Sequence, residues 1–158
     1  MDSLTIARAL HVLAIVHWIG GVAMVTLVIL PAVARLAVPE QRLALFEAVE
    51  GRFGAQARYS VTLAGLTGFY MTYELDAWDR FLDPGYWWMH AMFLVWALFT
   101  VILFVAEPLF LHAWFRRRAA RDPVGTMARV LMAHVVLLAA AGLTVVGAVL
   151  GAHGAGLW

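Results

Sequence analysis

Cysteine and lysine are both missing from this chain, and charged residues of any kind are few. Without cysteine, the chain cannot form disulfides, iron–sulfur clusters, thiolate metal sites or c-type haem attachments. Without lysine, it cannot form a Schiff base with a carbonyl substrate. The formal net charge is +1 at pH 7, which gives no reason to expect nucleic acid as a partner.

Apolar residues dominate instead: 64% of the 158 residues are hydrophobic and 13% are charged, and the mean hydropathy is +0.85. They gather in four blocks, at about 4–30, 58–75, 86–115 and 124–151. Each block is long enough as a helix to cross a hydrocarbon core of about 30 Å, and too long for a barrel strand. The sequence therefore predicts an all-α, integral membrane four-helix bundle. It forms a single domain over residues 1–158, with the lipid bilayer around it.

A short amphipathic helix is expected between the first two apolar blocks, in the segment "PEQRLALFEAVEGRF". Pro39 suits the first turn of a helix, and Gly51 and Gly54 mark its end. One face of this helix is apolar: Leu43, Phe46, Val49 and Phe53. Most charged residues fall elsewhere, among them Glu47 and Glu50. We expect the helix to lie on the cytoplasmic interface, or to pack beneath the bundle.

The arginines predict the orientation. Nine of the eleven basic residues lie in the two connections that follow the first and third blocks: Arg35, Arg42, Arg52, Arg58, Arg116, Arg117, Arg118, Arg121 and Arg129. The positive-inside rule then places both termini outside. We expect a multi-pass protein of a bacterial-type inner (plasma) membrane, with periplasmic termini.

Four histidines lie inside the apolar blocks at depths that match in pairs. Counted along the helices from the outer end, His17 lies roughly 20 Å deep and His134 roughly 24 Å deep. His11 lies roughly 10 Å deep and His90 roughly 6 Å deep. Because His11 and His17 are about 120° apart around one helix, they are expected to serve different partners.

Matched imidazoles on different helices are typical of a bis-histidine b-type haem. Small residues that would make room for a macrocycle flank these positions: Ala14, Gly20, Gly21, Ala64, Gly65, Gly68, Ala133, Ala140, Ala141 and Gly147. Ordinary packing of membrane helices uses small residues too, and a membrane histidine can simply bond to a neighbouring hydroxyl or carbonyl. We take His17, His134, His11 and His90 as candidate haem or metal ligands.

Two stretches carry a family resemblance: "LHVLAIVHWIGGVAMVTLVILPAVARL" and "RFGAQARYSVTLAGLTGFYM". They resemble the copper-resistance D (CopD) type of membrane domain, which implies copper transport or handling. The chain is more distantly similar to the HemJ-type protoporphyrinogen oxidases, which are small helical membrane proteins. That similarity implies a haem-liganding histidine early in the first helix, at His11. Methionines offer copper little support, since only Met89 and Met92 cluster, around His90.

Glu107 is the one carboxylate in the interior of an apolar block, since Glu74 lies at the very end of the second. We expect it to pair with an arginine of the loop that follows, with proton uptake from the cytoplasm as the alternative. As a whole, the sequence predicts a membrane-embedded b-type haem protein for electron transfer, with a quinone or a periplasmic redox protein as partner. CopD-like copper handling, a HemJ-like oxidase and a cofactor-free subunit of a larger complex stay open, as does a homodimer.

Overall fold

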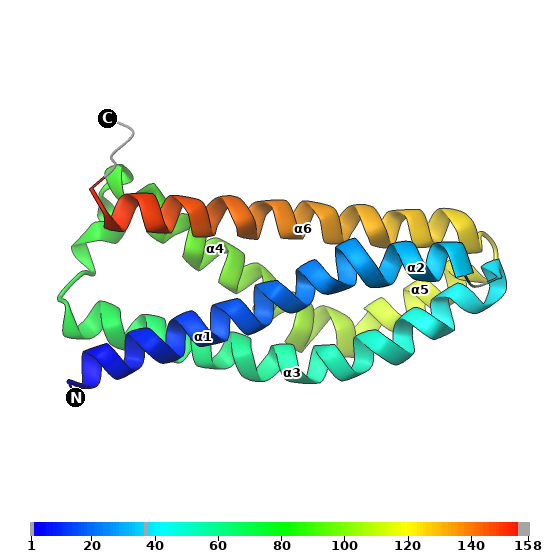
Figure 1. The fold of residues 1–158 in the computed structure, drawn as a ribbon, viewed down its shortest axis with the longest axis horizontal. Helices are drawn as coiled ribbons and strands as arrows, with labels where there is room; N and C mark the ends of the chain where they lie inside the picture. Colours follow the sequence, from blue (N-terminus) through cyan, green and yellow to red (C-terminus); the bar gives the residue numbers. More distant parts are fainter. Residues whose placement is uncertain (1, 37, 155–158) are drawn as a thin grey trace.

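The computed structural model describes residues 2–36 and 38–154, and this part of the chain is helical throughout, with short turns (Figure 1). The first rod combines α1, a π-helical segment η1 and α2, and the second is α3 alone. Short 3-10 helices η2 and η3 precede the third rod, which is α4, the π-helical η4 and α5. The fourth is α6. Their bounds are α1 (Ser3–Met24), η1 (Val25–Ile29), α2 (Leu30–Leu36), α3 (Pro39–Glu74), η2 (Asp79–Leu82), η3 (Pro84–Tyr86), α4 (Trp87–Val101), η4 (Ile102–Leu111), α5 (His112–Ala119) and α6 (Pro123–Ala152).

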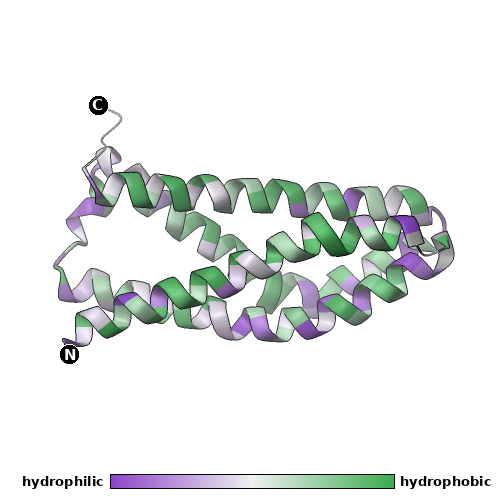
Figure 2. Cartoon of the chain, viewed as in Figure 1, coloured by the Kyte–Doolittle hydropathy of each residue, from purple (hydrophilic) through white to green (hydrophobic). Residues whose placement is uncertain are grey.

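Three of the four rods are long and apolar enough to cross a membrane, over Ser3–Arg35, Pro84–Ala119 and Pro123–Ala152. The all-α prediction is confirmed, and so is the apolar character of these three rods. The predicted second span, 58–75, lies in α3, which is not among them. Hydrophilic positions recur along α3 in Figure 2, whereas α6 is mostly hydrophobic.

The prediction of a separate amphipathic helix is wrong. The predicted segment does begin a helix at Pro39, but that helix runs without a break to Glu74. Gly54 does not end it, because this glycine serves a contact: a Cβ at this position would lie 3.4 Å from Oε1 of Glu107. A tertiary contact therefore explains a glycine that the sequence suggested was a helix end.

Aromatic rings that pack against glycines of neighbouring helices hold the rods together. The buried core at mid-bundle centres on Trp18 of α1 and Phe99 of α4, whose rings meet edge to face with centroids 4.8 Å apart. Trp96 of α4 lies over Gly65 of α3, and its Nε1–H donates to the carbonyl oxygen of Val61, 2.9 Å away. Trp87 similarly covers Gly147 of α6. Several of the small residues therefore make room for side chains of the protein itself.

Gly65→Ala should destabilise the fold, because its Cβ would lie 2.7 Å from the Trp96 ring that the Val61 bond fixes in place. We expect a loss of about 1–3 kcal/mol, as for other overpacked cores. Gly142→Ala in α6 is the matched control, since a Cβ there has no neighbour within 4 Å. Thermal unfolding in detergent measures both variants. Equal stability of the two would contradict this packing.

Candidate functional site

His11 is fixed between α1 and α3. Its Nδ1 lies 3.0 Å from the carbonyl oxygen of Ala64 and 3.0 Å from Oγ1 of Thr67. Gly68 leaves space for the ring, since a Cβ at that position would lie 3.3 Å from Cε1 of His11. Nδ1 of His11 is therefore held by α3 inside the bundle, and this sets the orientation of the ring.

His17 contacts the same helix but lies exposed on the surface of the bundle. Its Nδ1 is 2.8 Å from Oγ of Ser60, whose hydroxyl donates to the carbonyl oxygen of Gln56 at 3.3 Å. With the hydroxyl donating to Gln56, we assign His17 the tautomer in which Nδ1–H donates to the Ser60 oxygen. This tautomer leaves the lone pair on Nε2, which has no partner among the residues that the structure describes.

His17 and His134, which the sequence pairs at one depth, have different partners in the structure. His134 bonds through Nδ1 to the carbonyl oxygen of Val130, in its own helix, and its ring meets Phe46 of α3 edge to face. Phe46 and Ser60 are 14 residues apart in α3, which is about 21 Å along a helix. Side chains point toward the N-terminus of their helix, so imidazoles on the antiparallel α1 and α6 diverge.

His90 does not pair with His11 either. Its Nδ1 lies 3.1 Å from the carbonyl oxygen of Tyr86, and its Nε2 lies 2.9 Å from that of Phe81. Both ring nitrogens thus lie against backbone carbonyls at the connection that precedes α4, which holds the ring on that side of the bundle. The prediction from depth alone failed here because local carbonyls at the start of α4 capture the ring.

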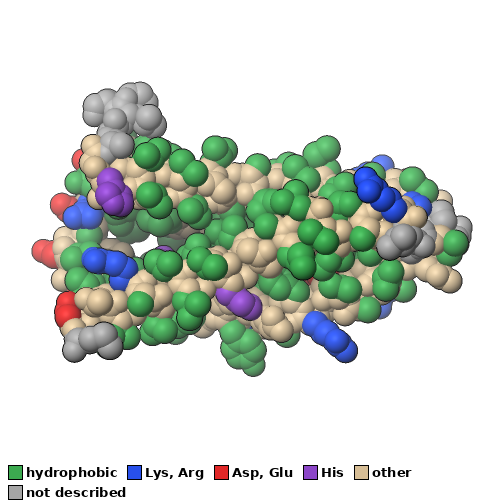
Figure 3. Space-filling model, in the orientation of Figure 1, with side chains coloured by type: hydrophobic (Ala, Val, Ile, Leu, Met, Phe, Trp, Pro, Cys, Tyr) green, Lys and Arg blue, Asp and Glu red, His purple; other side chains and the backbone are tan. Residues whose placement is uncertain are grey.

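A groove lies on α3, and its lining residue Gln56 is one helical turn from Ser60, the hydrogen-bond partner of His17. It has a volume of about 500 Å³ and is lined by Ala48, Val49, Arg52, Phe53 and Gln56. Gln56 and Arg52 lie one and two helical turns from Ser60, on the same side of α3. On α1, Gly20 has open space around it. We call His17, Gly20, Ser60 and this groove the α1–α3 seam. In Figure 3, histidine and arginine side chains interrupt an otherwise hydrophobic surface.

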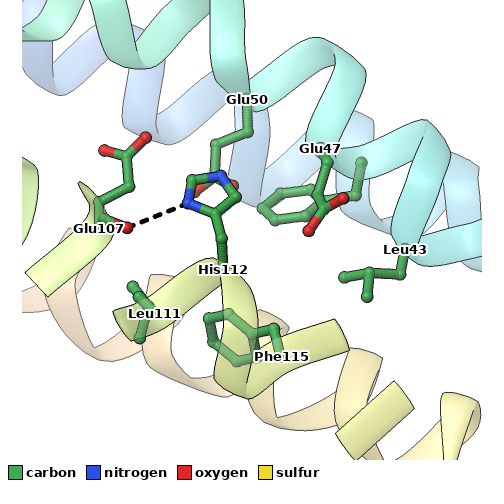
Figure 4. Close-up of a pocket in the computed structure, with 8 residues that line it drawn as sticks. Leu43, Glu47, Glu50, Glu107, Leu111, His112 and Phe115 are labelled. Carbon is green, nitrogen blue, oxygen red and sulfur yellow. Dashed lines mark hydrogen bonds between the residues drawn. The ribbon is translucent and has the colours of Figure 1, made fainter. Parts of the chain in front are cut away.

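A second polar cluster lies inside the bundle, where α3 meets η4 and α5 (Figure 4). Arg58 holds it together: its Nη2 lies 3.1 Å from Oε2 of Glu107, and its Nε donates to the carbonyl oxygen of Leu103 at 3.0 Å. In a π-helix the nitrogen of residue 108 would bond to that carbonyl, but Pro108 has no N–H. Arg58 therefore satisfies a carbonyl that the proline leaves without a partner. The expected ion pair of Glu107 exists, but its partner comes from α3 and not from the loop after α5.

Glu47 and Glu50 line the same cluster, contrary to the prediction that they lie on a polar outer face. The cavity between them is about 10 Å³, the size of one water molecule. Nδ1 of His112 lies 3.1 Å from the carbonyl oxygen of Glu107, and Oε1 of Glu47 is buried with no partner among the described residues. Burial, together with the charge of Glu107, raises the pKa of Glu50 to about 7. The spacing of Glu47 and Glu50 relative to Phe46 is the sequence signal that could have placed them in this cluster. When Phe46 is buried in the bundle, Glu47 and Glu50 of the same helix face Glu107.

Known proteins offer no parallel: the chain matches no family model, no curated protein and no solved structure. The resemblance to the CopD type therefore stays a prediction. Among the described residues, no group of three or more His, Asp or Glu side chains is placed to hold a metal ion. Two of the described histidines are exposed, His17 and His153, and of these His17 lies within an apolar rod.

Glu50→Gln should become more stable relative to wild type as the pH rises. The raised pKa means that the folded protein binds a proton that the unfolded chain has lost between about pH 4.5 and 7, so wild-type stability falls across that window. The difference in unfolding free energy between Glu50→Gln and wild type should grow by roughly 3 kcal/mol as the pH rises to 8, because each pKa unit corresponds to 1.36 kcal/mol. Thermal unfolding at several pH values measures it, with Glu74→Gln, exposed at the far end of α3, as control. A pH-independent difference would contradict the assignment.

Proposed function

We propose that this chain is a membrane-embedded b-type haem protein for electron transfer, and that His17 supplies an axial imidazole. One observation carries the proposal: His17 is exposed near the middle of a 33-residue apolar helix, with Nδ1 bonded to Ser60 and no partner at Nε2 among the described residues. An ionisable or ligating side chain at mid-membrane is a functional site by default.

The bond to Ser60 is of the kind that orients a metal-binding histidine. Such histidines almost always donate the second ring N–H to a hydrogen-bond acceptor, which fixes the tautomer and raises the basicity of the ligating nitrogen. His17 meets this requirement before any metal is bound. His11 shows the same bond to α3, but its ring is half-buried inside the bundle, whereas that of His17 is exposed.

The surroundings of His17 fit a porphyrin. Gly20, one turn from His17, leaves its side open, and the groove on α3 has apolar walls at Val49 and Phe53. Haem carries two propionate groups, and the exposed guanidinium of Arg52 on the groove wall is suited to bind a carboxylate. When bound, the haem would supply one-electron redox chemistry, while the chain orients it and sets its electrostatic environment.

We also propose the four-span topology with both termini outside, on the strength of the arginine distribution. The end that carries α2, α5 and the start of α6 is then cytoplasmic, and it holds the arginine cluster 116–118. A haem at mid-membrane suits a quinone or a periplasmic redox protein as its electron-transfer partner. Copper in place of haem, as in CopD-like handling, is the alternative that the following experiment separates.

His17→Ala should abolish haem binding, because the iron loses the one imidazole that the seam presents. Wild-type protein, purified in mild detergent after expression with haem precursor, should show a reducible Soret band with sharp α and β bands. His153→Ala is the control, since His153 is exposed at the end of α6 and bonds to its own helix through Nδ1. A wild-type protein without a chromophore but with stoichiometric copper would contradict the proposal, as would an unchanged spectrum in His17→Ala.

A further inference from the structure

Three carboxylates converge inside the bundle, where α3 meets η4 and α5 (Figure 4). Glu47 and Glu50, three residues apart, share one face of α3, and Glu107 of η4 lines the same cavity. Glu107 is paired, since its Oε2 lies 3.1 Å from Nη2 of Arg58. The side chain whose positive charge acts on Glu50 is His112 of α5, a single imidazole. If Glu47 and Glu50 were both ionised beside it, unmatched negative charge would be buried, which is strongly unfavourable.

A cavity of about 10 Å³ lies between these groups, which is the size of one water molecule. Glu47 lines this cavity, and its Oε1 is buried with no hydrogen-bond partner in the part of the chain that the structure describes. Buried carboxylate oxygens in proteins normally accept a hydrogen bond. What this oxygen lacks is an O–H donor, which a water molecule or a protonated carboxyl group supplies.

We propose that Glu47 and Glu50 bind one exchangeable proton, which a water molecule in this cavity passes between the pair and bulk water. In the loaded state Glu50 is a carboxylic acid, and its O–H donates to Oε1 of Glu47 directly or through the water. Uptake transfers one proton from hydronium to a carboxylate oxygen and leaves a water molecule, so charge and atoms balance. The site goes beyond the proposed function and does not depend on haem binding at His17.

The position of the cluster gives the proton a short route to solvent. His112 is four residues from the exposed Arg116, which is about 6 Å along a helix. That end of the bundle is cytoplasmic in the proposed topology. Nδ1 of His112 lies 3.1 Å from the carbonyl oxygen of Glu107, which only accepts, so we assign the ring proton to Nδ1 and the lone pair to Nε2. The ring extends from α5 toward Glu47 and Glu50, so it can relay a proton to them (Figure 4).

The electrostatics of Glu50 favour proton exchange near neutral pH. Burial and the charge of Glu107 raise its pKa to about 7, with a smaller contribution from Glu47, while His112 acts in the opposite direction. Other ionisable side chains on the surrounding helices are Arg58, which reaches Glu107, His134 of α6, which packs against α3 one turn before Glu50, and Arg35 of α2, which is exposed. A carboxyl group with a pKa close to the ambient pH both takes up and releases a proton readily.

Infrared spectroscopy of the full-length protein in lipid nanodiscs tests the proposal, because the C=O stretch of a protonated carboxyl group is distinct from that of a carboxylate. Wild type should gain one such band between pH 9 and pH 6, with a midpoint near 7, and the band should shift in D₂O. Glu50→Gln should lose the band. Glu47→Gln should move its midpoint to lower pH, because a neighbouring negative charge is removed. Glu74→Gln, exposed at the far end of α3, is the matched control and should leave the band unchanged.

Leu111→Phe separates exchange through the cavity from a proton that is merely trapped. Leu111 lines the cavity, and the larger ring fills it while every carboxylate remains. The band should persist in this variant, and its shift in D₂O should become slower than in wild type. A shift at the wild-type rate would overturn the route through the cavity water.

Two further results would overturn the proton site itself. One is a wild-type protein with no protonated carboxyl band above pH 6, or a band that is the same in Glu50→Gln and Glu47→Gln. The other is a titration seen only in imidazole bands and lost in His112→Asn, which would place the proton on α5. Circular dichroism of each variant confirms that the helices are formed.

Discussion

Polar side chains inside an apolar bundle must find their partners within the protein, and in this chain α3 provides them. Every side-chain hydrogen bond or ion pair between the long rods, in the part of the chain that the structure describes, has α3 on one side. His11 and His17 reach it from α1, Trp96 reaches it from α4, and Arg58 extends from it to η4. An unsatisfied group in a membrane costs several kcal/mol, so these bonds decide how the rods are arranged.

This constraint explains why α3 is the least apolar rod and why it carries two distinct polar regions. Toward η4 and α5, Arg58 satisfies the carbonyl of Leu103 and pairs with Glu107, which stabilises the π-helical segment around Pro108. On its outer side, Ser60 holds Nδ1 of His17. The first region keeps an ion pair and a carbonyl contact inside the bundle, whereas the second holds an exposed imidazole whose Nε2 has no partner among the described residues. The proposed function rests on the second.

Much of the fold could be predicted from the sequence because hydrophobic length is a strong signal in a membrane protein. The blocks at 4–30, 86–115 and 124–151 correspond to rods at 3–36, 87–119 and 123–152. The α3 rod was predicted as two pieces, because Gly51 and Gly54 are ordinary helix-end signals and the contact of Gly54 with Glu107 cannot be seen from the sequence. The depth of a residue along its helix could be counted from the sequence, but the direction of its side chain around the helix axis could not. Counting therefore placed His17 near the middle of the first apolar rod, but it could not show that His134 packs against Phe46 or that His90 lies against the Phe81 carbonyl.

Chemical rescue tests the central claim, that the His17 imidazole itself binds the cofactor, more directly than loss of function does. His17→Gly removes the ring and leaves Ser60 and the groove in place. Titration of this variant, in the presence of haem, with free imidazole should restore the low-spin visible spectrum, because the added base occupies the space of the missing ring. N-Methylation at the nitrogen that would face Ser60 should weaken this rescue, since the methylated base cannot donate to Oγ. A haem spectrum in His17→Gly that matches wild type without imidazole would contradict the account.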